Sequence, residues 1–129
     1  MAVAAPMTEP AFLVLTALAG VPRHGYGIVG EVAELSHGRV HMKIGTLYGV
    51  LDRLVGEGLV ELDREEIRQG RLRRYYRLTE SGGDALAADA ERQAANAQTA
   101  ADRLRSWRPA RVGGRGRRAL RPASDGGIA

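Results

Sequence analysis

The sequence has no cysteine among its 129 residues. It therefore has neither a disulfide framework nor a thiolate metal site, and this composition favours a reducing cytoplasm. Long apolar runs are lacking too, since none approaches the roughly 20 residues that a membrane span needs. The start "MAVAAPMTEP" lacks the basic and apolar regions of a secretory signal. We therefore expect a soluble cytoplasmic protein with no membrane partner.

Patterns typical of catalysis and of metal binding are also missing. The three histidines, His24, His37 and His41, fall in predicted loops or at helix ends, without a carboxylate at ligand spacing. Surface or helix-capping roles fit them better than metal coordination. No Ser-His-Asp arrangement, phosphate loop or glycine motif after a strand is present. The sequence thus predicts no catalytic residue, no metal, no cofactor and no enzymatic activity.

Positive charge is unevenly distributed along the chain. Residues 108–129 hold six arginines and one acid, which leaves 13 basic and 14 acidic residues in 1–107. This segment is rich in glycine, proline and arginine, so we expect a disordered tail. It is either simply solvated or makes non-specific contacts with nucleic-acid phosphates. Within the remainder, "RQGRLRRYYR" at 68–77 carries five arginines and no acid, which fits a solvated hairpin or a nucleic-acid contact.

Helix signals dominate the first half of the chain. Thr8 can cap a short apolar helix that ends at Gly20. After the turn "VPRH", the apolar spacing in residues 25–36 predicts a second helix. A third begins near Lys43, and Gly58 supplies its C-terminal stop.

The second half predicts a hairpin and one long helix. Residues 59–65 and 72–78 alternate apolar and charged side chains, and Gly70 suits a tight turn between them. Thr79 can cap an alanine-rich helix that extends to about Ser106. The element order is therefore three helices, a hairpin and a terminal helix.

This order is that of a winged helix-turn-helix domain, and three motifs make the resemblance specific. "HGYGI", "TLYGVLDRLVGEGLV" and "RRYYRLTESG" occur in the order and spacing of the PadR family of bacterial transcriptional regulators. The chain resembles the shorter subclass, with a single terminal helix, over about residues 10–106. The resemblance implies a mainly α fold with a two-stranded wing. Its expected parts are a disordered start (1–7), a DNA-binding domain (8–78), a dimerisation helix (79–107) and the basic tail (108–129).

The third helix has the pattern expected of a recognition helix. Its apolar positions are predicted to face inward, and the opposite face is built from small residues and two cations: Lys43, Gly45, Thr46, Gly49, Val50 and Arg53. Cations and Thr46 can contact phosphates or base edges, and the glycines allow close approach to a major groove about 12 Å wide. In the alternative interpretation, the glycines only weaken a surface helix, by about 1 kcal/mol each.

Two tyrosines and the wing arginines complete the candidate DNA-binding set. By resemblance Tyr48 lies beside DNA, and its amphipathic side chain can also be partly buried. Tyr26 can donate to a phosphate at a helix N-terminus, with packing as the alternative role. Alternation along a strand puts Arg71 and Arg73 on one face near the tip, where we expect DNA contact. Arg77 is expected in an ion pair instead. Natural partners for the wing arginines that do not contact DNA are the acids of the first strand, which are Glu61, Asp63, Glu65 and Glu66.

The terminal helix carries a coiled-coil pattern. Its predicted seam consists of Leu86, Ala90, Gln93, Ala97, Ala100, Leu104 and Trp107. By resemblance, the first helix of the partner chain packs beside it, which adds Phe12 and Leu13 to the dimer interface. A C2 dimer would place two recognition helices one DNA turn apart, about 34 Å, on a near-palindromic operator. The alternative is a solitary helix packed on its own domain.

The expected function is that of a homodimeric, sequence-specific DNA-binding regulator, a repressor released by a small-molecule effector. Some family members bind planar aromatic compounds through aromatic side chains of the terminal helix. Residues 80–106 contain no aromatic residue, and Trp107 comes only at the end, which argues against such a stacking pocket. The alternative function is a winged-helix protein-interaction module without specific DNA binding.

Overall fold

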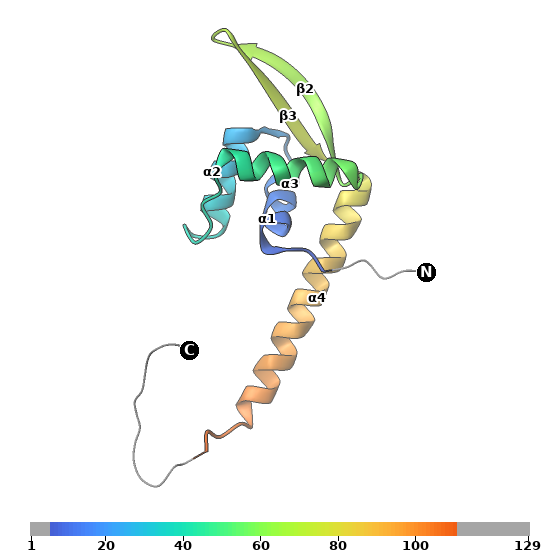
Figure 1. The fold of residues 1–129 in the computed structure, drawn as a ribbon. Helices are drawn as coiled ribbons and strands as arrows, with labels where there is room; N and C mark the ends of the chain where they lie inside the picture. The colour runs from blue at the N-terminus through green and yellow to red at the C-terminus, as the bar shows by residue number, and fades with distance from the viewer. Residues whose placement is uncertain (1–5, 111–129) are drawn as a thin grey trace. The chain divides into compact units, whose positions relative to one another are not determined.

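Four helices and a small antiparallel sheet make up the fold of the computed structural model, which describes residues 6–110. The elements are α1 (Glu9–Leu18), β1 (Arg23–His24), α2 (Gly25–Leu35), α3 (Ile44–Gly56), β2 (Val60–Arg68), β3 (Arg71–Leu78) and α4 (Glu80–Arg105). Figure 1 shows the helices and the long strands β2 and β3. The predicted order of helices and hairpin is confirmed. Contacts divide the chain into two compact units, one through Ala94 and one from Ala95 onward.

The predicted terminal segments fall largely outside the described residues. Residues 1–5 of the segment 1–7 and residues 111–129 of the tail 108–129 are not described. Met7 is described and packs against the core. Its backbone N–H donates to the buried carboxylate of Asp89 on α4, at 3.3 Å, so the chain is held to the domain just before α1 begins.

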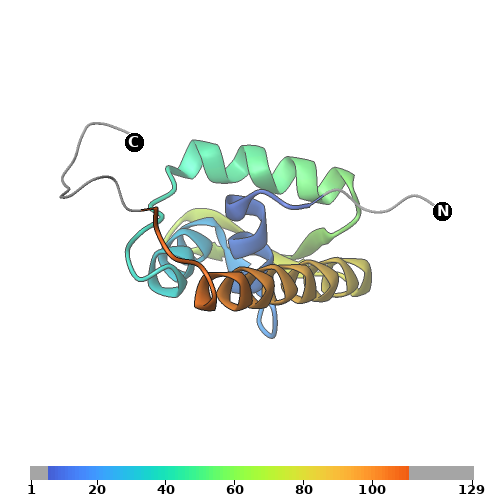
Figure 2. The same ribbon diagram turned by 90° about the horizontal axis from the view of Figure 1, so that it is seen from below.

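The apolar helix α1 lies at the centre of the first unit, beneath α3 and beside α2 (Figure 2). As predicted, Thr8 caps it, because the threonine side chain accepts a hydrogen bond from the backbone N–H of Ala11. Val14 and Leu15 are completely buried. From α2 and α3, the core receives Ile28, Val32, Leu47, Leu51 and Leu54. Burying each such aliphatic side chain contributes about 1.5–3 kcal/mol.

The sheet differs from the predicted two-stranded hairpin, because it has three strands in the order β1, β3, β2. The segment "VPRH" was expected to be a turn, but Arg23 and His24 pair with Tyr76 and Tyr75 of β3. A strand of two residues carries no detectable alternation, and its pairing depends on a distant segment. This short strand fixes the start of α2 against the wing.

The wing is also longer than predicted. Residues 66–71 were expected to form the connection, but β2 continues to Arg68 and β3 begins at Arg71. Only Gln69 and Gly70 turn the chain, with φ angles of 52° and 75°, as in the two-residue turns that match the twist of a hairpin. A bulge interrupts the pairing between Leu62 and Arg64.

The end of the wing is joined closely to the beginning of α4. Thr79 caps α4 by accepting from the backbone N–H of Gly82 at 2.9 Å, and its hydroxyl donates to the carbonyl of Gly58 at 2.6 Å. Gly82 is buried, and a β-carbon there would overlap the carbonyl oxygen of Leu59. Glycine at this position is therefore required by packing and not by backbone conformation.

Candidate nucleic-acid interface

Helix α3 has one buried face and one bare face. Leu47, Leu51 and Leu54 are buried. Gly45 and Gly49 are exposed, and a β-carbon added to either would meet no neighbouring atom within 4 Å. Thr46 is exposed as well. The backbone of α3 is thus accessible along this face without side-chain bulk, as a helix that enters a groove requires.

Val50 is a correction to the predicted outward face. It is partly buried and packs against the core, because it lies between the buried stripe and the exposed one. Asp52 is exposed on α3, and it was not among the residues predicted for this surface. Burial and then Tyr48 raise the pKa of Tyr76, Arg74 lowers it, and the charge of Asp52 raises it by a smaller amount. Asp52 therefore adds a negative charge to the exposed side of α3.

Two exposed tyrosines lie beside the bare face. Tyr26, in the first turn of α2, is 68% exposed, and Tyr48 on α3 is 42% exposed. A β-carbon on Gly25 would lie only 2.6 Å from the hydroxyl oxygen of Tyr48. Glycine at position 25 therefore lets Tyr48 pack with its hydroxyl end against the beginning of α2, while the residue as a whole stays partly exposed.

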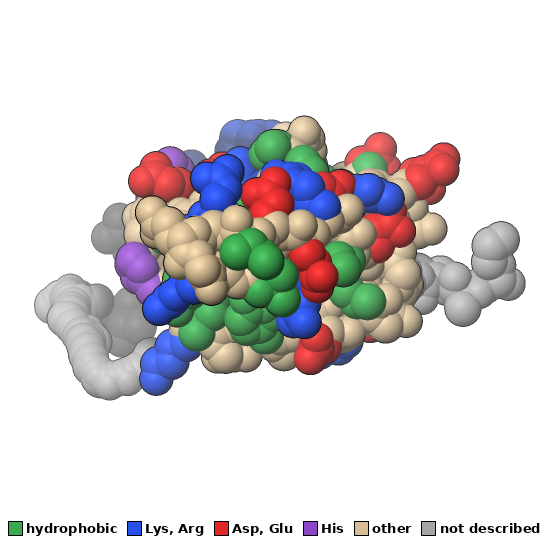
Figure 3. All heavy atoms as spheres, turned by 90° about the horizontal axis from the view of Figure 1, so that it is seen from above, with side chains coloured by type: hydrophobic (Ala, Val, Ile, Leu, Met, Phe, Trp, Pro, Cys, Tyr) green, Lys and Arg blue, Asp and Glu red, His purple; other side chains and the backbone are tan. Residues whose placement is uncertain are grey.

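Charges on the wing are mostly paired. Arg77 binds Glu61 at 2.7 Å and Asp63 at 2.9 Å, which confirms its predicted ion pair. Arg74 binds Glu65 at 2.9 Å. Within the described part of the chain, Arg71 and Arg73 form no ion pair. The face seen from the side of the wing accordingly shows basic, acidic and hydrophobic side chains close together (Figure 3), and Arg71 and Arg73 remain available to an external anion.

A cleft of about 310 Å³ brings four of the predicted residues together. It lies between the start of α2, α3 and the wing, and is lined by His24, Gly25, Tyr26, Tyr48, Arg71, Leu72, Arg73 and Arg74. The sequence predicted Tyr26, Tyr48, Arg71 and Arg73 but missed the other four. The pairing of β1 with β3, which no local pattern indicates, is what places His24 and Gly25 there.

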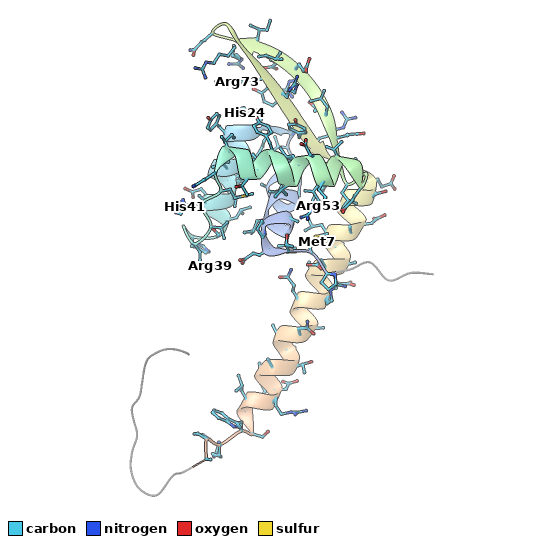
Figure 4. All side chains as sticks on the ribbon, viewed as in Figure 1. Met7, His24, Arg39, His41, Arg53 and Arg73 are labelled. Atoms are coloured by element: carbon cyan, nitrogen blue, oxygen red, sulfur yellow. The ribbon has the colours of Figure 1, made fainter. Side chains whose placement is uncertain are left out.

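Lys43 and Arg53 lie apart from this cleft. Lys43 is the exposed residue that precedes α3 and makes no side-chain capping bond. Arg53 lines a different, largely apolar cavity of about 450 Å³, together with Met7, Thr8 and Glu57. Figure 4 shows Arg73 and His24 on the wing side of α3 and Arg53 on the other side, toward Met7. Arg53 and the wing arginine Arg73 therefore lie on two flanks of α3 and do not form one patch.

His24 has a structural role that fits its predicted place at a helix end. Its Nδ1 accepts a hydrogen bond from the backbone N–H of Gly27 at 3.3 Å and so caps α2. The ring packs edge-on against Tyr75, with 5.3 Å between centroids. Burial, and then the charges of Arg73 and Arg68, lower the pKa of His24. A neutral imidazole is therefore favoured, which keeps Nδ1 free to accept this bond.

The predicted dimerisation residues differ in exposure. Leu13 is only 8% exposed and belongs to the core of its own chain, and Phe12 and Leu86 are partly buried against that core. Ala90, Ala97 and Ala100 are exposed, as are Leu104 at 60% and Trp107 at 56%. Because α1 is almost entirely apolar, its sequence did not distinguish the stripe that the core covers. Of the described helices, none is long and apolar enough to cross a membrane.

Comparisons with known proteins bear on the fold and on the family. The sequence profile of the "Transcriptional regulator PadR-like family" matches residues 14–88. An uncharacterised protein of Lysinibacillus sphaericus is 33% identical over 60 residues, which cover 46% of this chain and 55% of that protein. The chain therefore spans about half the length of this curated relative.

Solved structures of PadR family proteins have a similar fold. A PadR family transcriptional regulator of Eggerthella lenta DSM 2243 is 25% identical, with a TM-score of 0.63 over 74% of this chain and 81% of that one. Bacillus subtilis PadR, solved in complex with operator DNA, is 26% identical, with a TM-score of 0.57 over 64% of this chain and 47% of that one.

The family match covers more than half of the chain, and the neighbours share its winged helix and C-terminal helix. The family and its solved members are transcriptional regulators and not enzymes, as the sequence predicts. The chain belongs to the PadR-like family of transcriptional regulators.

Proposed function

We propose that this protein is a homodimeric, sequence-specific DNA-binding regulator that represses transcription from a near-palindromic operator and is released by a small-molecule effector. One observation carries the DNA-binding part. The bare face of α3 adjoins a cleft in which two exposed tyrosines meet Arg71 and Arg73, the wing arginines that lack an acidic partner in the described residues. A smooth helix face beside available cations is complementary to a groove and its phosphates.

The two flanks of α3 suit the two walls of a major groove. A helix that lies in this groove has a phosphate backbone on each side, so cations are useful on both flanks. Arg71 and Arg73 would serve one backbone, and Arg53 on the other flank of α3 would serve the opposite one. Lys43 and Thr46 at the start of α3, with Gly45 and Gly49, would then contact bases or nearby phosphates. Bacillus subtilis PadR, solved with operator DNA, supports this proposal.

Dimerisation would use the exposed seam of α4. Ala90, Ala97, Ala100, Leu104 and Trp107 are exposed in the single chain, and small side chains allow two helices to approach closely while burying little area. The partly buried Phe12 and Leu86 would extend the interface beyond this narrow seam. Leu13 would contribute less, since its own core already covers it. A C2 dimer then matches the symmetry of a near-palindromic site.

Repression follows if the dimer occupies a promoter and excludes the transcription machinery. An effector would release it by binding the non-DNA-bound conformation more tightly than the DNA-bound one. The effector would not stack on aromatic side chains of α4, because residues 80–105 include none. Loss of operator binding on adding fractions of a host metabolite extract would identify it.

A protein-interaction module is the alternative, and the wing gives it an argument. Glu61, Asp63, Glu65 and Glu66 line β2 and pair with four of the nearby arginines. A strand with this many acids reduces the positive potential that attracts DNA. In this alternative, the same hairpin would bind a polar protein surface.

Selection of DNA by the purified protein distinguishes the two functions. The full chain and a truncation after Trp107 are each incubated with random 30-base-pair duplexes, and the bound fraction is sequenced. We expect both proteins to enrich one near-palindromic sequence, which is bound with nanomolar affinity and a steep salt dependence. Binding that disappears with the tail and shows no sequence preference would instead support the interaction module.

Substitutions of single cations test whether the proposed residues contact DNA. Arg71→Gln and Arg73→Gln should each weaken binding and lower the slope of log K against log salt by about one. Arg77→Gln is the matched control, because it removes the same charge from β3 but from an arginine that is already paired. Lys43→Gln and Arg53→Gln should weaken binding as well. Unchanged affinity in the Lys43, Arg53 and Arg71 variants would rule out this interface.

A further inference from the structure

The tip of the wing carries two exposed aliphatic side chains directly opposite each other. Ile67 on β2 is 75% exposed and Leu72 on β3 is 55% exposed, and the two residues are paired in register. Ile67 is the most exposed large hydrophobic residue of the described chain. A single exposed aliphatic residue needs no explanation. Two that are paired at the end of a hairpin form one apolar knob, which the rest of the described chain does not cover.

Basic residues lie next to this knob along both strands. Arg68 and Arg71 form the next pair toward the turn, and Arg73 faces Glu66 in the next pair away from it. Because successive residues of a strand point to opposite faces, the aliphatic pair lies on one face of the hairpin and these arginines on the other. Leu72 also lines the cleft that contains Arg71 and Arg73. The knob is therefore continuous with the proposed DNA-binding surface.

We propose that Ile67 and Leu72 form an apolar wedge that enters the minor groove of the bound duplex. The inference rests on the proposed function and extends it to a part of the wing that no charge explains. Cross-strand β-carbons lie about 5 Å apart, so the pair is comparable in width with a minor groove of about 6 Å. Apolar wedges in this groove contact the sugars and partly unstack a base step.

Charge complementarity selects DNA as the occupant of this surface over an apolar protein partner. Arg71 and Arg73, which form no ion pair among the described residues, flank Leu72 along β3, with their side chains on the other face of the hairpin. Phosphates line both walls of a minor groove, so an apolar pair in the groove brings these arginines close to the backbone. The wedge would thus favour flexible pyrimidine–purine steps at the position of the wing, where deformation costs least.

The salt dependence of binding distinguishes the contribution of the apolar wedge to DNA affinity from that of the arginines. Binding of an apolar group releases no condensed counterions, whereas each neutralised phosphate contributes to the salt slope. Removing the wedge should therefore lower affinity at every salt concentration by the same factor. Removing an arginine should reduce both the affinity and the slope.

The test compares four forms of the full chain on the duplex that the wild-type protein enriches from the random pool. They are the wild type, the double variant Ile67→Thr with Leu72→Thr, the variant Arg71→Gln, and Leu35→Thr as a control. Threonine keeps the preference for a strand, and Leu35 is an exposed leucine at the end of α2, outside the wing. Binding is measured by fluorescence anisotropy at several salt concentrations, and folding and oligomeric state by thermal unfolding and sedimentation.

We expect the double variant to bind about tenfold more weakly with an unchanged salt slope, Arg71→Gln to lower the slope by about one, and Leu35→Thr to bind like the wild type. Binding of the double variant within twofold of the wild type would overturn the wedge and leave the proposed function intact. A changed oligomeric state of the double variant would also overturn the wedge, because the pair would then act in a contact between protein chains. A lower salt slope would overturn it too, because the pair would then act by positioning the arginines that contact phosphates. If the wild type enriches no sequence, the proposed function fails and the wedge fails with it.

Discussion

Two adjacent glycines at the start of α4 differ in whether there is room for a side chain. A β-carbon at Gly82 would overlap the carbonyl oxygen of Leu59, whereas one at Gly83 would lie 3.9 Å from a methyl group of Leu78. We expect Gly82→Ala to lower the free energy of unfolding by about 2 kcal/mol, as overpacking does. Gly83→Ala should raise it by up to about 1 kcal/mol through helix propensity. Urea unfolding of both variants measures this, and equal effects would contradict the close contact.

Substitutions at Gly49 are expected to affect the stability of the fold and the proposed DNA binding differently. No neighbouring atom lies within 4 Å of a β-carbon at this position, so Gly49→Ala should stabilise the chain by up to about 1 kcal/mol. Gly49→Gln should leave the fold intact as well, but its side chain would occupy the space that the groove needs. Thermal unfolding and operator binding are compared for both variants. A glutamine variant that binds DNA like the wild type would show that α3 does not approach the groove along this face.

His24 makes stability depend on pH. An unfolded histidine titrates near about pH 6.5, and the pKa of His24 is lowered in the fold, mainly by burial. The unfolded chain therefore binds more protons, so the stabilising contribution is complete above about pH 6.5 and is lost as the pH falls below it. The carboxylates of Glu9, Asp63 and Asp89, whose pKa values are also lowered, lose their contributions in more acidic solution, below about pH 4.

The variant His24→Asn tests this assignment. Asparagine caps helices well but does not titrate. Its free energy of unfolding should therefore change less than that of the wild type between pH 7 and pH 5, as measured by urea unfolding at each pH. Identical pH profiles for the two proteins would show that another group is responsible.

At the scale of elements, the wing turn offers a simple test. Gln69 has a positive φ of 52°, which is strained for glutamine, and Gly70 follows with 75°. Asparagine before glycine is the preferred pair in such a turn. Gln69→Asn should therefore raise the free energy of unfolding by about 0.5–1 kcal/mol, and Gln69→Val, a β-branched residue, should lower it. A stabilising valine would contradict the assigned turn.

The helices could be predicted closely because their ends carry local signals. Thr8, Thr79 and Gly58 mark boundaries through their own side chain or backbone, and the observed helices agree with the prediction to within about two residues. The strands were less predictable. β1 has two residues and no alternation, and the outer part of the wing is exposed on both faces, so "EEIR" has no apolar face to reveal its period.

The candidate site was predictable only where it follows from periodicity. The buried stripe of α3 and the pairing of Arg77 could be inferred from helix and strand geometry. The cleft could not, because His24 and Gly25 reach it through the pairing of β1 with β3. The placement of Arg53 with Met7 likewise depends on where the N-terminal segment packs.

At the scale of the whole molecule, the proposed dimer depends on the exposed seam of α4. Ala97→Glu with Ala100→Glu would place like charges from two chains together at a close helix contact, so we expect a monomer in sedimentation equilibrium and a large loss of operator affinity. Ala95→Glu is the matched control, because position 95 lies on the opposite side of the helix from the seam. A dimer that survives the double substitution would place the interface elsewhere.

Thr79 connects the proposed DNA-binding and dimerisation elements at one point. Its backbone N–H donates to the carbonyl of Leu59 at 3.1 Å, its hydroxyl donates to Gly58, and it caps α4 immediately after β3 ends. The wing and the first turn of α4 therefore have a common anchor without a flexible linker. If the hairpin contacts DNA as proposed, a force on it would be transmitted to the first turn of α4, and a displacement of that turn would change the angle of the hairpin.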